Sequence, residues 1–205
     1  MARRGTELRE HILWSAKNAF IETGFERTSM DLVASRAETS KRTLYAYFET
    51  KDKLFLAVVD LVRDLYLANI KTPEHYAQDT VEAITLLCGR FLQMLLWEQV
   101  LRTCRMGIAE AHRLPGASAQ YYETFFAATQ ERLAAFVEER YHLQSAVGTA
   151  VARDLIARTV YPRFVRALFG VEELLADLPD EASIAADLDL APIREAVVEL
   201  LAMRS

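Results

Sequence analysis

The chain has 205 residues and a net charge of −5, and 205 residues are enough for one domain with a large core or for two small domains. Hydrophobic residues make up 52% and charged residues 26%, as in an ordinary globular protein, and the seven Gly and five Pro favour long helices over turn-rich β structure. We expect neither a membrane span nor a secretory signal, because no apolar run approaches ~18 residues and the N-terminus lacks an apolar stretch.

The charge is distributed unevenly. Residues 1–53 contain ten Lys/Arg and eight Asp/Glu, a net charge of +2, whereas the remaining residues carry −7. A mildly basic head on an acidic body suggests that only the head meets a polyanion, although so small an excess is also compatible with chance. Cys88 and Cys104 have no framework spacing, so we interpret them as reduced core thiols of a cytoplasmic protein.

Three helices are predicted near the N-terminus. An apolar stripe from Leu8 to Phe20 predicts a helix over about residues 6–22, which Gly24 ends in a left-handed conformation. Thr28 and Ser29 offer capping oxygens to a short second helix, "MDLVASRA". Ser40 caps a short third helix, "KRTLYAYF", which buries Leu44 and Phe48. Two short helices joined by a tight turn and braced by a longer one follow the helix-turn-helix plan.

In that plan the third helix enters the major groove of DNA. Arg42 can then read guanine edges, and Thr43 can contact a thymine methyl group or a phosphate. The other candidate contacts fix the register on the phosphate backbone. The predicted DNA-binding residues are Thr28, Ser29, Ser40, Lys41, Arg42, Thr43, Tyr45, Tyr47 and Lys51. The alternative interpretation is a solvated cationic helix that carries a few core aromatics.

The stretch "AFIETGFERTSMDLVASRAETSKRTLYAYFETKDKLF" resembles the DNA-binding domain of the TetR family of transcriptional regulators over about residues 8–58. The resemblance implies that Ser29 binds phosphate, that Lys41, Arg42 and Thr43 contact the groove, and that Tyr45, Tyr47 and Lys51 hold phosphates. The chain departs from the family at Glu38-Thr39, where Gly-Val is usual, so Glu38 has to adopt the turn geometry that glycine takes freely. Arg42 stands where a small residue is common.

The rest of the chain is predicted to be helical over residues 52–71, 79–103, 105–114, 118–141, 145–169 and 190–203. Pro73, Pro115-Gly116, Gly170 and the stretch "DLPDEASIAADLDLAP" separate these segments, and Pro162 is expected to kink or end its helix. The stretch "RMGIAEAHRLPGASAQYYE" resembles the AefR-like subgroup. We therefore expect an all-α chain of two domains, a helix-turn-helix domain over 1–52 and an effector-binding and dimerisation domain over 53–205.

The resemblance implies a homodimeric regulator, by default a repressor that a small apolar or aromatic effector releases from a palindromic operator. The residues expected to line the effector pocket are aromatic or soft, although such stripes are more often plain core. They are Tyr66, Phe91, Met94, Leu95, Trp97, Cys104, Ile108, Tyr122, Phe125, Phe126 and Tyr161. The polar candidates for a ligand contact are Arg102, Arg105, Glu110 and His112.

In the TetR family the last two long helices pair with their symmetry mates. The expected dimer interface comprises Val147, Val151, Leu155, Val165, Phe169, Ile193, Val197, Leu200 and Leu201. The alternative is that these stripes pack only within one subunit.

Two other classes of function are alternatives to a regulator. The four histidines are scattered without zinc spacing, and neither a nucleophile elbow nor a Gly-rich phosphate loop is present. We therefore expect no metal site, no cofactor and no catalytic activity. One alternative to this expectation is a cofactor-free all-α enzyme. A DNA-architectural protein without effector control is the other, and such proteins seldom carry a large acidic helical body.

Overall fold

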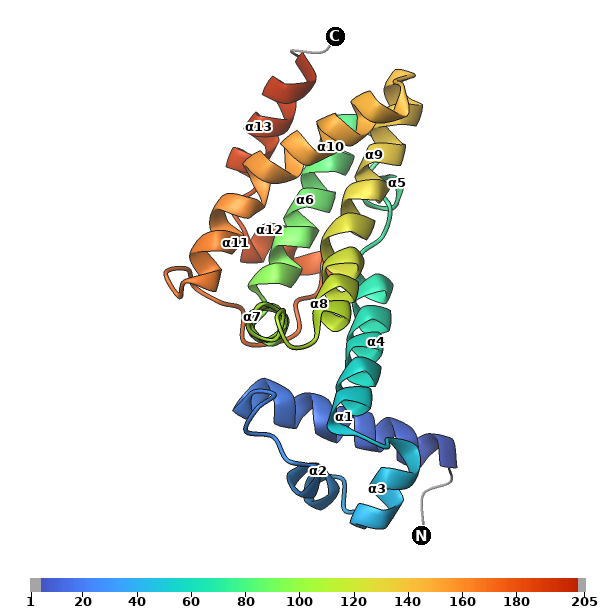
Figure 1. The fold of residues 1–205 in the computed structure, drawn as a ribbon. Helices are drawn as coiled ribbons and strands as arrows, with labels where there is room; N and C mark the ends of the chain where they lie inside the picture. Colours follow the sequence, from blue (N-terminus) through green and yellow to red (C-terminus); the bar gives the residue numbers. More distant parts are fainter. Residues whose placement is uncertain (1–4, 203–205) are drawn as a thin grey trace. The chain divides into compact units, whose positions relative to one another are not determined.

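The computed structural model describes residues 5–202, except for the side chains of residues 66–68. Regular structure in this range is helical apart from one isolated bridge between Trp97 and Leu175, which confirms the all-α expectation (Figure 1). None of the described helices is both long and apolar enough to cross a membrane.

The helices follow one another in three stretches. The N-terminal helices are α1 (Gly5–Thr23), α2 (Met30–Arg36) and α3 (Lys41–Tyr47). The middle of the chain forms α4 (Lys51–Asn69), α5 (Pro73–Tyr76), α6 (Thr80–Leu96), α7 (Glu98–Ala109) and α8 (Pro115–Tyr122). The remainder forms the π-helical turn η1 (Glu123–Ala127), α9 (Ala128–Tyr141), α10 (Ser145–Thr159), α11 (Tyr161–Leu168), the 3₁₀ turn η2 (Glu181–Ser183), α12 (Ile184–Asp187) and α13 (Ala191–Ala202).

The chain divides into two compact units. The head unit comprises the residues up to Leu65 together with Arg102–Tyr121, and the body unit comprises Tyr66–Leu101 together with the residues from Tyr122 onward. The head unit thus includes most of α7 and α8 as well as the N-terminal helices. The domain boundary expected between residues 52 and 53 stays a prediction. That point lies inside α4, most of which belongs to the head unit.

Within the head unit, α1 forms as its apolar spacing predicts. Ile12, Ala16 and Phe20 are buried, and α1 ends where Gly24 adopts a left-handed φ of 78° and donates its N–H to the Phe20 carbonyl at 2.9 Å. Lys17 is also buried, with its Nζ 4.6 Å from the ring centroid of Trp14, and this burial lowers the pKa of the ammonium.

Three phenylalanines join the elements of the head unit. Phe20 of α1 stacks on Phe25 of the corner that precedes α2, with ring centroids 5.5 Å apart. Phe55 of α4 meets both rings edge to face, at 5.4 Å from Phe20 and 5.1 Å from Phe25. Because such aromatic pairs add to the free energy of burial, the cluster fixes α1, the corner and α4 against one another.

The turn between α2 and α3 has the geometry of a Schellman motif. Glu38 takes a left-handed φ of 49° and donates its N–H to the Ser35 carbonyl at 3.1 Å, while the Thr39 N–H donates to the Ala34 carbonyl at 3.0 Å. The expectation that Glu38 has to adopt a glycine-like conformation is therefore confirmed. This residue carries backbone strain that a glycine would not.

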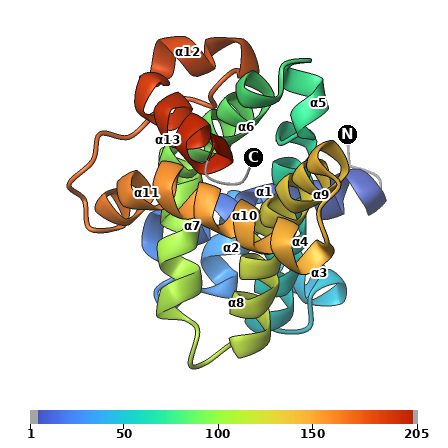
Figure 2. The same cartoon turned by 90° about the horizontal axis from the view of Figure 1, so that it is seen from above.

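In the body unit, α6 is buried on all sides, as expected for a helix that is apolar around its whole circumference. It packs against α5, α9, α10, α11, α12 and α13, several of which surround it in Figure 2. Its two polar interruptions, Arg90 and Gln93, are buried as well and bond to each other at 2.5 Å.

These two side chains hold the segment that precedes α13. Arg90 donates to the Pro179 carbonyl at 3.0 Å, and Gln93 donates to the Asp180 carbonyl at 3.0 Å and to the Asp187 carboxylate at 2.5 Å. Burial of a guanidinium is stable only when its donors are satisfied, so this network both permits the burial of α6 and positions residues 179–187. The short helices η2 and α12 in this segment, like α5, were not predicted.

Three of the long predicted helices are interrupted in the structure. The predicted helix over 79–103 ends at Leu96, because Leu175 donates its N–H to the Leu96 carbonyl at 3.0 Å and accepts the Glu98 N–H at 2.9 Å. Trp97 consequently has an extended ψ of 125°. The predicted helix over 118–141 instead starts at Pro115 and contains the π-helical turn η1.

Prolines begin helices here rather than separating them. Pro73 and Pro115 are the first residues of α5 and α8, where the missing N–H has no cost. The predicted helix over 145–169 ends at Thr159, and Pro162 lies in the first turn of α11. Of the two effects expected near Pro162, a kink or a helix end, the structure shows a helix end, and the proline lies in the first turn of the next helix.

The strain at Glu38 leads to a stability prediction. Replacing Glu38 by Gly should raise the free energy of unfolding by about 1 kcal/mol, because glycine adopts a left-handed φ without steric cost. The measurement is urea denaturation. The control Glu38→Ala removes the same carboxylate but keeps a Cβ, so it should gain little; equal gains in both variants would show that charge, not strain, is responsible.

Candidate nucleic-acid interface and effector site

The α3 helix presents one polar face to solvent and one apolar face to the head unit. Leu44 and Phe48 are buried and hold the helix in place, as predicted. Lys41, Arg42 and Tyr45 are exposed. The face that resembles the recognition surface is therefore available to a macromolecule.

Capping hydrogen bonds fix both short helices. The Ser29 hydroxyl accepts the Leu32 N–H at 3.1 Å, and the Ser40 hydroxyl accepts the Thr43 N–H at 3.1 Å. Ser40 and Thr43 also share a side-chain hydrogen bond of 2.8 Å. The start of α3, where base contacts are expected, is thus held in a defined conformation.

The two cations of α3 differ in their surroundings. Lys41 pairs with Asp31 of α2 at 2.6 Å, with both side chains more than half exposed. Arg42 forms no hydrogen bond or ion pair with any described residue. Its guanidinium can therefore reach a base edge without first breaking an intramolecular contact.

Tyr47 combines exposure with a structural contact. Its hydroxyl donates to the Gly5 carbonyl at the start of α1, at 3.1 Å. Tyr47 is still more than a third exposed, so its expected contact with the DNA backbone stays a prediction.

Thr28 and Lys51, both expected to contact DNA, make hydrogen bonds inside the head unit. Thr28 is only 1% exposed, and its hydroxyl donates to the Gly24 carbonyl at 2.7 Å, so it stabilises the corner and cannot reach DNA. The Lys51 ammonium donates to the carbonyls of Phe25, Glu26 and Thr28 at 2.9, 3.3 and 3.1 Å. Because an ammonium has three N–H bonds, a phosphate could bind Lys51 only in competition with these carbonyls.

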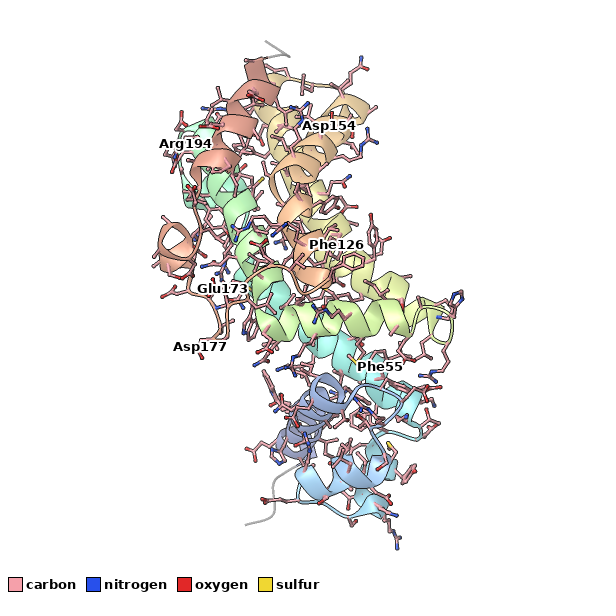
Figure 3. The ribbon with its side chains drawn as sticks, turned by 90° about the vertical axis from the view of Figure 1, so that its left-hand side faces the viewer. Phe55, Phe126, Asp154, Glu173, Asp177 and Arg194 are labelled. Atoms are coloured by element: carbon pink, nitrogen blue, oxygen red, sulfur yellow. The ribbon has the colours of Figure 1, made fainter. Side chains whose placement is uncertain are left out.

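Several of the predicted pocket residues meet in the body unit. Phe126, which is labelled in Figure 3, lies in the π-helical turn η1. Its ring centroid is 5.9 Å from that of Phe91, 5.7 Å from that of Tyr122 and 6.3 Å from that of Tyr161. Phe164, which the sequence reading missed, is 5.4 Å away. Its position three residues after Tyr161 on one face of a helix is a signal that could have found it. We call these five residues the aromatic cluster.

Other predicted pocket residues have different surroundings. Met94, Leu95 and Phe125 are buried in the core of the body unit. Trp97 is half-buried, and its Nε1 atom is buried without a hydrogen-bond partner among the described residues. The side chain of Tyr66 lies outside the described residues.

Cys104 and Ile108 belong to the head unit. Burial raises the pKa of the Cys104 thiol to about 12 and that of Cys88 in α6 to about 11, and both thiols are free, which confirms that they are core cysteines. Ile108 is 64% exposed, so it does not line an enclosed cavity in this structure.

An arginine that the sequence reading did not single out is the most connected residue of the α7–α8 loop. Arg113 pairs with Glu110 at 2.9 Å and with Asp52 of α4 at 3.0 Å, and its guanidinium carbon is 3.9 Å from the ring centroid of Phe25. Glu110, a predicted ligand contact, is therefore largely buried in an internal ion pair. Arg102, Arg105 and His112 are exposed.

The predicted dimer interface divides into two sets. The majority are buried within one subunit, as the alternative interpretation expects: Val151, Leu155, Ile193, Val197, Leu200 and Leu201. Val147, Val165 and Phe169 are exposed, Phe169 by 82%, and Val198 of α13, which was not among the predicted residues, is exposed as well. Only the exposed residues are free to contact another chain.

Two family models match the chain. The model described as "Bacterial regulatory proteins, tetR family" matches residues 12–58, and that described as "AefR-like transcriptional repressor, C-terminal domain" matches residues 82–177. Together they cover more than half of the 205 residues.

Individual proteins show the same relationship. The HTH-type transcriptional regulator QacR of Staphylococcus aureus (strain Mu50) is 37% identical over 54 residues, which are 26% of this chain and 29% of that protein. The chain spans only about a third or less of the length of the curated relatives it matches.

Solved structures match over nearly the whole chain. A TetR-family transcriptional regulator from Mesorhizobium loti has a TM-score of 0.77 at 24% identity and covers 98% of both chains. The Flavonoid-responsive Regulator FrrA has a TM-score of 0.72 at 24% identity and covers 97% of this chain and 95% of its own. These similarities show a shared fold. The two family matches, the capped helices α2 and α3 and the helical body together establish that this chain belongs to the TetR family of bacterial transcriptional regulators, with an AefR-like C-terminal domain.

Proposed function

We propose that the protein is a homodimeric repressor that binds a near-palindromic operator and releases it when a small apolar or aromatic molecule binds the body unit. The observation that carries the proposal is Arg42, exposed and without a partner among the described residues, on a capped α3 helix in a TetR-family head. Family membership favours a regulator over the enzyme and the architectural protein weighed above. The free, buried thiols support a cytoplasmic location.

Operator recognition would depend on a small number of side chains. A guanidinium without an intramolecular partner can donate two hydrogen bonds to O6 and N7 of guanine. Lys41 would have to exchange its Asp31 partner for a phosphate, so its contribution to affinity would be smaller. Tyr45, Tyr47 and the exposed Ser29 would contact the DNA backbone and set the register.

Dimerisation would provide the second head that a palindrome requires. Val165 and Phe169 at the end of α11, with Val198 on α13, expose large apolar side chains that water solvates poorly. A two-fold axis beside α11 would bury Val165 and Phe169 against the same residues of the partner chain. The homodimer thus rests on the exposed set, not on the residues already buried in one subunit.

The aromatic cluster is the proposed effector site. A π-helical turn is rare and is frequently found at functional sites, and here it carries Phe126 into the centre of four other rings. The neighbour named Flavonoid-responsive Regulator FrrA supports an aromatic effector. Such a ligand would release DNA only if it binds the non-binding conformation more tightly than the DNA-binding one.

The DNA-binding prediction concerns Arg42. With an operator selected from random duplexes, Arg42→Ala should lose about 10- to 100-fold in affinity for that operator and little for random DNA, because a bidentate base contact contributes about 1–3 kcal/mol of discrimination. Gel-shift titration measures both affinities. The control Arg140→Ala removes an exposed arginine of α9 and should bind both DNAs like the parent. An Arg42→Ala variant with parental operator affinity would show that α3 is misassigned.

The dimer prediction concerns the exposed patch. The double variant Val165→Glu, Phe169→Glu should sediment as a monomer and lose most operator affinity, because it places charges where apolar side chains would be buried. Leu178→Glu, which adds a charge at another exposed apolar residue, should remain dimeric. A parent protein that sediments as a monomer at micromolar concentration would rule the dimer out.

The effector prediction concerns Phe126. Aromatic compounds that raise the Tm of the parent should release operator, and Phe126→Ala should weaken their binding by at least about tenfold, since one aromatic contact can contribute more than 1.4 kcal/mol. The control Phe136→Ala removes a buried ring of α9 outside the cluster; it should lower the Tm but keep parental affinity. If both variants bind the compounds equally well, the effector site lies elsewhere.

A further inference from the structure

A groove of about 430 Å³ lies within the head unit, separate from both sites described above. Its walls are the end of α1 with the corner up to Arg27 on one side and α7 from Arg102 onward on the other. None of its lining residues belongs to α3 or to the aromatic cluster. A ligand in this groove would therefore compete directly neither with DNA for α3 nor with the proposed effector for the aromatic cluster.

The floor of the groove is apolar. Phe20, Phe25 and Met106 line it and are each less than 9% exposed, and Ile21 and Ala109 extend the apolar surface toward the rim. A groove of this volume is in the range of small-molecule sites. Its floor would favour the hydrocarbon part of a ligand over a fully hydrated ion.

The rim is predominantly cationic. Arg27, Arg102 and Arg105 line it, against two acidic residues, Glu26 and Glu110. Glu110 is largely buried and already paired with Arg113 at 2.9 Å. The lining thus comprises three cations and two anions.

Arg27 supplies a donor fork at the rim. Its Nε donates to the Thr23 carbonyl at 2.9 Å, which holds the side chain near the end of α1. Its two terminal nitrogens have no partner among the described residues. A guanidinium in this state is suited to bind a carboxylate through charge-assisted hydrogen bonds.

We propose that this groove is a second ligand site, which takes an amphipathic carboxylate with its hydrocarbon part on Phe20, Phe25 and Met106 and its charged group at Arg27. A groove with an apolar floor and a cationic rim favours such a ligand over a DNA phosphate, because the phosphate has no apolar part to bury. Because the walls come from α7 and from the α1 corner, an occupant would tie these two elements together. The site is independent of the effector site in the body unit.

The test uses octanoate as the probe and octan-1-ol as its uncharged control, with the full-length protein in titration calorimetry. Octanoate should bind at one site per chain and at least about tenfold more tightly than octan-1-ol, because only the carboxylate pairs with a guanidinium. Arg27→Gln should reduce octanoate affinity at least about tenfold, and Ala109→Phe, at an exposed position, should block the groove.

Two controls separate this site from others. Arg140→Gln removes an arginine far from the groove in sequence and outside the head unit, and Phe126→Ala alters the aromatic cluster; both should bind octanoate like the parent. Binding that Phe126→Ala abolishes, binding unaffected by Arg27→Gln and Ala109→Phe, or no binding at millimolar octanoate would each overturn the proposal. Circular dichroism of each variant shows that it is folded.

Discussion

The contacts that organise the head unit meet at the ring of Phe25. Two cations lie over it, the Lys51 ammonium at 4.2 Å and the Arg113 guanidinium at 3.9 Å from the ring centroid, and Phe20 and Phe55 pack against it. Each cation also bonds to other parts of the unit, Lys51 to corner carbonyls and Arg113 to Asp52. One aromatic side chain therefore brings α1, the start of α4 and the α7–α8 loop to a common point, and it does so through contacts that are strong when shielded from water.

The body unit is governed by a different constraint, the burial of polar groups. The α6 helix can lie at the centre of the body only because Arg90 and Gln93 find acceptors on residues 179–187. That requirement explains why a segment with little regular structure is held closely against the core. The two units are thus stabilised by different kinds of contact. Aromatic and cationic contacts organise the head unit, and a buried hydrogen-bond network organises the body unit.

Local sequence signals predicted what local physics determines. The stop at Gly24, the caps at Ser29 and Ser40 and the strained turn at Glu38 all depend on neighbouring residues, and each was found. The break at Trp97 was not, because it is imposed by Leu175, which is far away in the sequence. Tertiary contacts likewise directed Lys51 toward the corner carbonyls and joined Arg113 to Asp52 and Phe25, and no spacing in the chain encodes those contacts. The same limit applies to the dimer surface, since periodicity cannot tell which apolar stripe is covered within the subunit.

The chain contains two tryptophans, and the division into units gives each unit one. Trp14 is partly exposed and has an ammonium over its ring, whereas the indole nitrogen of Trp97 is shielded from water at the junction of α6 and α7. Their fluorescence should therefore differ in emission wavelength and in access to soluble quenchers. The protein thus contains an intrinsic optical reporter for each unit, which can show whether a bound molecule acts on the head or on the body without any added label.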